Sequence, residues 1–195
     1  QLSSTAQAQC QQRLSDNSAA ITDLLTSSVD EAGRKYKSLF EQESGTARNK
    51  GLSQSQLKKV SEAAKKLCTS QLESLVQPWV LEEEEYQVAL TNLGKKIQAQ
   101  QAGLDKANQA TVNEMLGKTA DKQVAGLQQT KIEPFPDTPS IITKKIAQLS
   151  SDLLRLLRES CDRFEYPEIT KAVLAATAVR LEAFSAEKSK ENKDQ

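Results

Sequence analysis

Histidine is absent from this 195-residue sequence, which removes the commonest general base and metal ligand at neutral pH. The spacings of the GxSxG nucleophile elbow, the HExxH zinc motif, the CxxC pair and the EF-hand loop do not occur either. No segment has the alternation of a strand that could precede a glycine-rich phosphate loop. We therefore expect no enzyme activity, no catalytic residues, no bound cofactor and no metal site.

An excess of one charge and a long apolar run are also missing. The 26 basic residues balance the 26 acidic ones, so no net field draws the chain to nucleic acid or to an anionic membrane. The most apolar window, Ile169 to Val179, contains Lys171 and is shorter than the ~18 residues that a membrane span needs. We expect a soluble chain that binds no nucleic acid and has no transmembrane segment.

Cysteine is scarce, because Cys10, Cys68 and Cys161 are the only three and lie far apart. A disulfide framework requires a denser and even set, and no Asn-x-Ser/Thr acceptor occurs. Both observations favour a reducing, intracellular and specifically cytoplasmic setting, with secretion after leader cleavage as the alternative. Since Gln1 is not a natural start, we expect residues to precede it, belonging to a longer protein rather than to a leader.

Glycine (7), proline (5) and aromatic residues (4%) are few, as is typical of an all-helical protein. The clearest helix covers Asp137 to Phe164, where apolar residues recur every three or four positions. Thr138 as a cap and Pro139 in the first turn predict where this helix begins. Leu157 widens an apolar stripe that consists of Ile142, Ile146, Leu149, Leu153, Leu156, Cys161 and Phe164.

Three further helices are predicted before it, at residues 3–43, 53–76 and 86–129. In the last of these the apolar stripe weakens and glycine recurs, which predicts a bend or break between Gly103 and Gly117. The first helix has a stripe that consists of Cys10, Leu14, Ile21, Leu25, Ala32, Tyr36 and Leu39, with Leu24, Val29 and Phe40 at its margins.

The prolines of segment 131–139 predict a hinge. After it, helices 138–164 and 168–186 should form an antiparallel hairpin, and residues 187–195 a disordered charged tail. Thr177 should lie on the inner face, with its hydroxyl bonded to a carbonyl of the preceding turn. The predicted fold is all-α: an elongated bundle of four to six amphipathic helices with Pro/Gly hinges, forming one domain over residues 1–186.

The corner around Pro78 is the candidate protein-binding site. Proline ends or kinks the helix near Gln77, so the large apolar residues that flank it cannot all face inward. Trp79 either closes the end of the bundle or anchors a partner, and the acidic run beside it favours a helix start and attracts a basic partner. The predicted site comprises Val76, Trp79, Val80, Leu81, Glu82, Glu83, Glu84 and Glu85.

These features predict a non-catalytic interaction subunit, a helical scaffold that joins or spaces protein partners in a larger complex. In architecture the predicted chain is similar to the helical-rod subunits of multi-protein assemblies such as vesicle tethers and kinetochore complexes. The alternative is a helical-bundle carrier for a lipid or another apolar small molecule, with helix 86–129 as its door. Protein partners would favour the first hypothesis, and bound lipid without a partner would favour the second.

Overall fold

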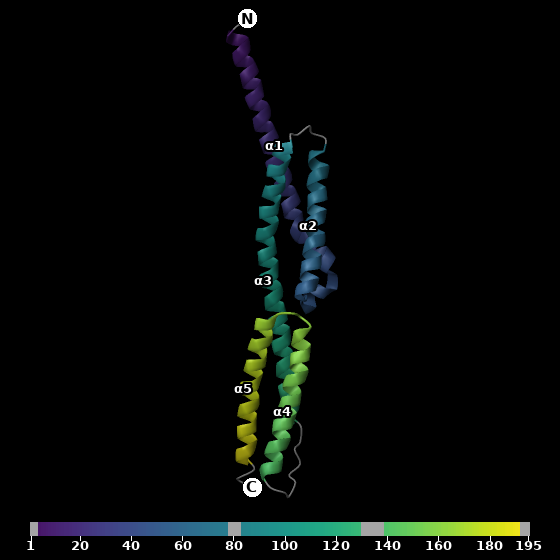
Figure 1. The fold of residues 1–195 in the computed structure, drawn as a ribbon, viewed down its shortest axis with the longest axis vertical. Helices are drawn as coiled ribbons and strands as arrows, with labels where there is room; N and C mark the ends of the chain where they lie inside the picture. The colour runs from purple at the N-terminus through teal and green to yellow at the C-terminus, as the bar shows by residue number, and fades with distance from the viewer. Residues whose placement is uncertain (1–3, 78–82, 130–138, 192–195) are drawn as a thin grey trace. The chain divides into compact units, whose positions relative to one another are not determined.

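A computed structural model of the chain describes residues 4–77, 83–129 and 139–191. Within these ranges the chain forms five α-helices, one 3-10 helix and no strand (Figure 1). The predicted all-α class and the predicted range of four to six helices are thus confirmed. The elements are α1 (Ser4–Ser44), the 3-10 helix η1 (Gly45–Lys50), α2 (Gln54–Val76), α3 (Glu83–Gln129), α4 (Pro139–Asp162) and α5 (Pro167–Glu191).

The chain divides into two compact units. Unit 1 consists of Gln1–Gly45 and Lys58–Asp105, and unit 2 consists of Thr46–Leu57 and Lys106–Gln195. Helices α2 and α3 each contribute residues to both units. The assignment of 1–186 to one domain stays a prediction.

Unit 1 is built from α1 and the parts of α2 and α3 that belong to it. Lys96 pairs with Asp30, and Gln100 Nε2 donates to the carbonyl of Gly33 at 2.9 Å, so α1 and α3 run in the same direction. The buried Tyr36 hydroxyl lies 2.8 Å from Ser61 Oγ and joins α1 to α2. The buried apolar residues are Val29, Ala32, Tyr36, Phe40, Ala64, Cys68, Leu72, Val76, Ala89, Leu93 and Ile97.

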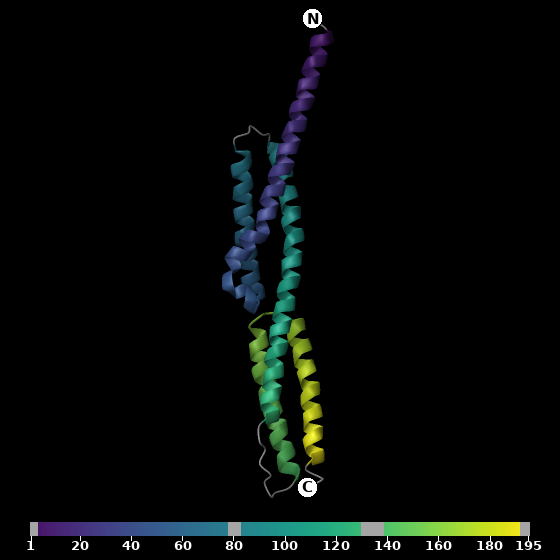
Figure 2. The same ribbon diagram turned by 180° about the vertical axis from the view of Figure 1, so that it is seen from behind.

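Unit 2 contains the predicted hairpin of α4 and α5, packed side by side and against the second part of α3 (Figures 1 and 2). One core cluster consists of Val112, Leu116, Ala120, Leu157, Cys161, Tyr166 and Val173. A second consists of Val124, Leu127, Ile146, Leu153, Leu181 and Phe184. Thr177 is buried among them and donates to the carbonyl of Val173 at 2.7 Å, as predicted.

The start of α2 is held by a local capping box and by a residue that is distant in sequence. Ser53 and Gln56 form a capping box, in which Gln56 N donates to Ser53 Oγ at 3.2 Å and Ser53 N donates to Gln56 Oε1 at 3.0 Å. Glu165, in the turn between α4 and α5, accepts hydrogen bonds from Ser55 N at 2.8 Å and from Ser55 Oγ at 3.1 Å. These bonds satisfy donors that a helix start leaves unpaired, so they fasten α2 to the α4–α5 turn.

A buried amide completes the same junction. The Asn108 side chain accepts from Leu52 N at 2.8 Å and donates to the Leu52 carbonyl and to the Tyr166 hydroxyl, both at 2.9 Å. Gly51 precedes this contact with φ +73°, and a Cβ there would lie 2.5 Å from Cγ2 of Val112. Only glycine tolerates both the backbone angle and the close approach.

Helix α3 is unbroken over 47 residues, so no break occurs between Gly103 and Gly117, where a bend or break was predicted. A Cβ at glycine 94, 103, 117 or 126 would meet nothing within 4 Å, which shows that none of these positions is a packing contact. Each glycine costs ~1 kcal/mol against alanine, but burial of residues such as Leu93, Ile97, Val112 and Leu116 offsets that cost.

Other differences from the predicted stripes concern single positions. In α4, Leu157 is fully buried whereas Leu156 is 48% exposed, because the inner line runs in steps of four through Leu153, Leu157 and Cys161. Helix α5 extends to Glu191, past the predicted end at 186, and α4 begins at Pro139 as expected. The predicted hinge at 131–139 falls almost wholly on residues outside those that the structure describes.

Candidate protein-binding groove

The predicted site residues fall into three groups. Val76 is buried at the end of α2, where it continues the inner line of Cys68 and Leu72, so its side chain is not available at the surface. Residues 78–82, which include Trp79, Val80, Leu81 and Glu82, lie outside the described ranges. The acidic residues Glu83, Glu84 and Glu85 form the first turn of α3, as predicted for a helix start.

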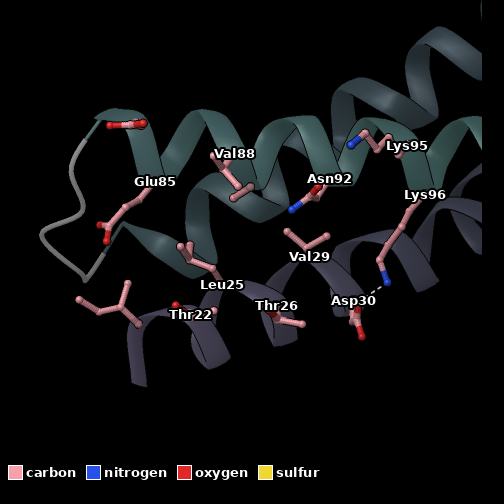
Figure 3. Close-up of a pocket in the computed structure, with 13 residues that line it drawn as sticks. Thr22, Leu25, Thr26, Val29, Asp30, Glu85, Val88, Asn92, Lys95 and Lys96 are labelled. Atoms are coloured by element: carbon pink, nitrogen blue, oxygen red, sulfur yellow. Dashed lines mark hydrogen bonds and ion pairs between the residues drawn. The ribbon is translucent and has the colours of Figure 1, made fainter. Parts of the chain in front are cut away.

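Two of those acidic residues border a groove within unit 1 that the sequence did not reveal. The groove lies between α1 and α3 and has a volume of about 800 Å³ (Figure 3). Its lining residues are Ile21, Thr22, Leu25, Thr26, Val29, Asp30, Glu84, Glu85, Val88, Ala89, Asn92, Lys95 and Lys96.

The floor of the groove is apolar because the two helices turn aliphatic side chains toward each other. Figure 3 shows Leu25 and Val29 of α1 facing Val88 of α3. Val88 is nonetheless 55% exposed, whereas Val29 is buried at 3% exposure. The floor is therefore deep at Val29 and open to solvent toward Val88.

Helices α1 and α3 lie close together at the closed end of the groove. At Gly33 a Cβ would lie 3.4 Å from Cδ of Lys96, which is van der Waals contact. The ion pair of Lys96 with Asp30 lies one turn away and spans the two helices. Ile21 and Glu84 line the opposite end of the groove.

Charge is distributed unevenly around the rim. Glu84 and Glu85 lie at the open end, near the start of α3, whereas Lys95 and Lys96 lie at the closed end with Asp30. Asn92, Thr22 and Thr26 line the remainder. The Thr22 hydroxyl donates to the Ser18 carbonyl at 2.9 Å.

An unpartnered stretch of helix adjoins the open end. Every residue from 7 to 20 of α1 is exposed, and Leu14 is 69% exposed. Figures 1 and 2 both show this purple part of α1 with no helix of unit 1 beside it. The prediction that Cys10 and Leu14 continue the buried stripe is therefore wrong, since α2 and α3 flank only the later part of α1.

The groove was not predicted from the sequence, because its position depends on which residues of α1 lie level with which residues of α3, here called the offset between the two helices. Asp30 pairs with Lys96, so a residue of α1 lies level with the α3 residue about 66 positions later. With α3 beginning at Glu83, the residues of α1 before about position 17 have no neighbour on α3. The exposed Leu14 was visible as an apolar residue, but nothing local to it reports this offset.

Two further surface hollows lie on unit 2. A hollow of about 760 Å³ on unit 2 is lined mainly by polar residues and is spanned by the Lys118–Glu114 pair. A second one, of about 360 Å³, contains the ion pair of Arg180 with Asp121.

The described residues contain no group of three or more His, Cys, Asp or Glu side chains that could hold a metal ion. None of the described helices has an apolar stretch long enough to cross a membrane. In the groove, two helices display an apolar strip between polar rims, which is the arrangement that binds an amphipathic helix. Comparisons of the chain with protein-family models, curated proteins and solved structures found no match.

Proposed function

We propose that this chain is a non-catalytic interaction subunit whose α1–α3 groove binds an amphipathic helix of a protein partner. The observation that carries the proposal is the apolar floor of Leu25, Val29 and Val88, exposed at its open end and bordered by charge. A partner helix with apolar residues at i, i+3 or i+4 and i+7 would bury this floor. A scaffold of the tethering or trafficking type is the role that such binding would serve.

The rim gives the partner a preferred direction. Glu84 and Glu85 at the open end favour basic residues there, and Lys95 at the closed end favours acidic ones. Rim charges of this kind act mainly on the association rate and on partner choice. The affinity itself is expected to depend on the apolar floor.

The test is capture of partners by crosslinking in the source cells, with two variants that each place a charge at an exposed valine. Val88→Asp introduces a charge into the groove, and Val179→Asp introduces one on α5 in unit 2. The two side chains are 55% and 65% exposed, so neither change should lower the melting temperature. Loss of an anchor costs at least ~2 kcal/mol, so Val88→Asp should reduce crosslinked partner about thirtyfold or more.

Val179→Asp should retain the same partners as the parent. If both variants capture them equally, the groove is not the binding site. Native mass spectrometry of the chain purified from its source provides the second readout. Bound lipid without any protein partner would overturn the interaction subunit in favour of the carrier.

A further inference from the structure

We propose that the helix bound in the α1–α3 groove is α1 of a second copy of this chain, so that two copies form an antiparallel dimer. The proposal rests on the proposed function, because it requires that the groove bind a helix. It adds the identity of that helix, residues 7–20 of α1, and the symmetry of the contact. Each copy then fills the groove of the other.

The first supporting observation is that residues 7–20 form a helix against which no described residue of unit 1 is packed. All fourteen are exposed, and the apolar Leu14 is more exposed than Val88 in the groove. An isolated helix of about 12 to 15 residues is only marginally stable in water. Such a segment gains stability by packing on a second helical surface.

The second observation is that the unpartnered segment and the groove share one line along α1. Leu14, Ser18, Ile21 and Leu25 follow one another at spacings of three and four, and the last two line the groove. A two-fold axis near Ser18 would place Leu14 of the second copy level with Thr22. There it would lie between Ile21 and Leu25 and opposite Val88.

The lengths of the two surfaces also match. At 1.5 Å per residue, the exposed segment of residues 7–20 is about 21 Å long, and the α3 side of the groove, residues 84–96, is about 20 Å long. Because the contact is isologous, it is made twice in each dimer. Repetition of the contact doubles the area that one groove buries, and specific interfaces bury ~1,200 Å² or more in total.

The axis also fixes the level of the charged residues of the segment against α3. Arg13 is the single basic residue between positions 4 and 20, and it adjoins Leu14. With the axis near Ser18, Arg13 of one copy lies level with position 23 of the other and near Ala89 of α3, about one helical turn from Glu85, and Asp16 lies near Tyr86. A parallel pair would instead place Arg13 beside its own counterpart and leave both grooves empty.

The first experiment is sedimentation velocity of the full chain over a range of protein concentrations. The parent should show a monomer–dimer equilibrium. Leu14→Asp should raise the dissociation constant about a hundredfold or more, because the symmetry removes two leucine contacts, each worth about tenfold or more. Val88→Asp should have an effect of similar size.

Val179→Asp is the matched control, since it charges a valine that is 65% exposed but lies outside the groove. It should leave the dissociation constant within about twofold of the parent value. A parent that is monomeric at every concentration overturns the dimer. An unchanged dissociation constant in Leu14→Asp overturns it as well.

The second experiment tests the antiparallel direction with the exposed Cys10. About the proposed axis, Cys10 of one copy lies level with position 26 of the other and near Asn92. Asn92→Cys should therefore form an intermolecular disulfide with Cys10 on mild oxidation. In the parent the two Cys10 residues would lie about 24 Å apart along the helix, too far for a disulfide. A Cys10–Cys10 disulfide in the parent would overturn the arrangement.

The failure of this inference can be distinguished from the failure of the proposed function. If the chain is monomeric and Val88→Asp still abolishes capture of a different protein, the second copy is refuted and the interaction subunit stands. If Val88→Asp changes neither self-association nor capture, both are refuted.

Discussion

Asp105, the last residue of unit 1, lowers the stability of the folded chain at neutral pH, because burial disfavours its charged form. Its Oδ1 is buried and has no hydrogen-bond partner among the described residues, and burial raises the pKa of this carboxyl above its ordinary value of 3.8. The Asp105 charge also helps to raise the pKa of Tyr36, although burial of that phenol is the larger cause. Asp105 therefore favours the protonated form in the folded chain.

The raised pKa of Asp105 makes the stability of the folded chain depend on pH. Between 3.8 and the raised pKa, the folded chain binds more protons at Asp105 than the unfolded chain does, so this contribution to stability falls as pH rises. Asp105→Asn removes the titration. Urea unfolding from pH 3 to pH 7 should show the variant gaining stability relative to the parent as pH rises. A constant difference between the two across this range would contradict the assignment.

Adjacent leucines in α4 give a second prediction at the residue scale. Leu157 is fully buried in the unit 2 core, whereas Leu156 is 48% exposed. Leu157→Ala should lower the free energy of unfolding by about 2 to 5 kcal/mol, since it removes buried methyl groups and leaves a cavity. Leu156→Ala, with the same change of side chain, should stay within about 0.5 kcal/mol of the parent. Equal losses in chemical denaturation would show that the helix faces are misassigned.

At the scale of elements, glycine has opposite consequences in η1–α2 and in α3. Gly51 has φ +73° and abuts Val112, so Gly51→Ala should cost at least about 1 to 2 kcal/mol from the backbone angle alone. Gly126 lies within α3 with open space around it, and Gly126→Ala should stabilise the chain by up to ~1 kcal/mol. Thermal melting of the two variants should therefore shift in opposite directions, and a shared direction would contradict this reading.

The sequence predicted those features of the elements that depend on neighbours within one helical turn. Pro139 starts α4, Thr177 bonds one turn back and the acidic run opens α3, because each is decided by local chemistry. By contrast, the contact between Asn108 and Leu52 joins residues 56 positions apart, and no local pattern reports it.

The candidate site was predictable to the same limited degree. The acidic start of α3 was located, but the apolar floor around Val88 was not. The floor exists only because α1 and α3 pack in parallel with an offset near 66 residues. A sequence shows which residues are apolar, but this offset decides which of them stay exposed.

At the scale of the whole molecule, α3 is the one described helix that contributes long segments to both units, residues 83–105 and 106–129. A proline at the exposed Lys106 tests whether it is truly continuous. Lys106→Pro removes a helical hydrogen bond and should cost about 3 kcal/mol, with reduced helical circular dichroism. Lys106→Ala is the control and should not destabilise the chain. A tolerated proline would indicate a break in α3 between the glycines, as sequence alone suggested.

The cap that Glu165 places on α2 has a consequence for the order in which the chain is made. Glu165 follows Ser55 by 110 residues, so at roughly 5 to 20 residues per second it is synthesised roughly 5 to 20 s later. During that interval the first amides of α2 have no carboxylate to bind, and Asn108 has no Tyr166 hydroxyl. Unit 2 therefore closes only after residue 165 has been synthesised, and a nascent chain that ends before residue 164 should exchange its Ser55 amide hydrogen rapidly.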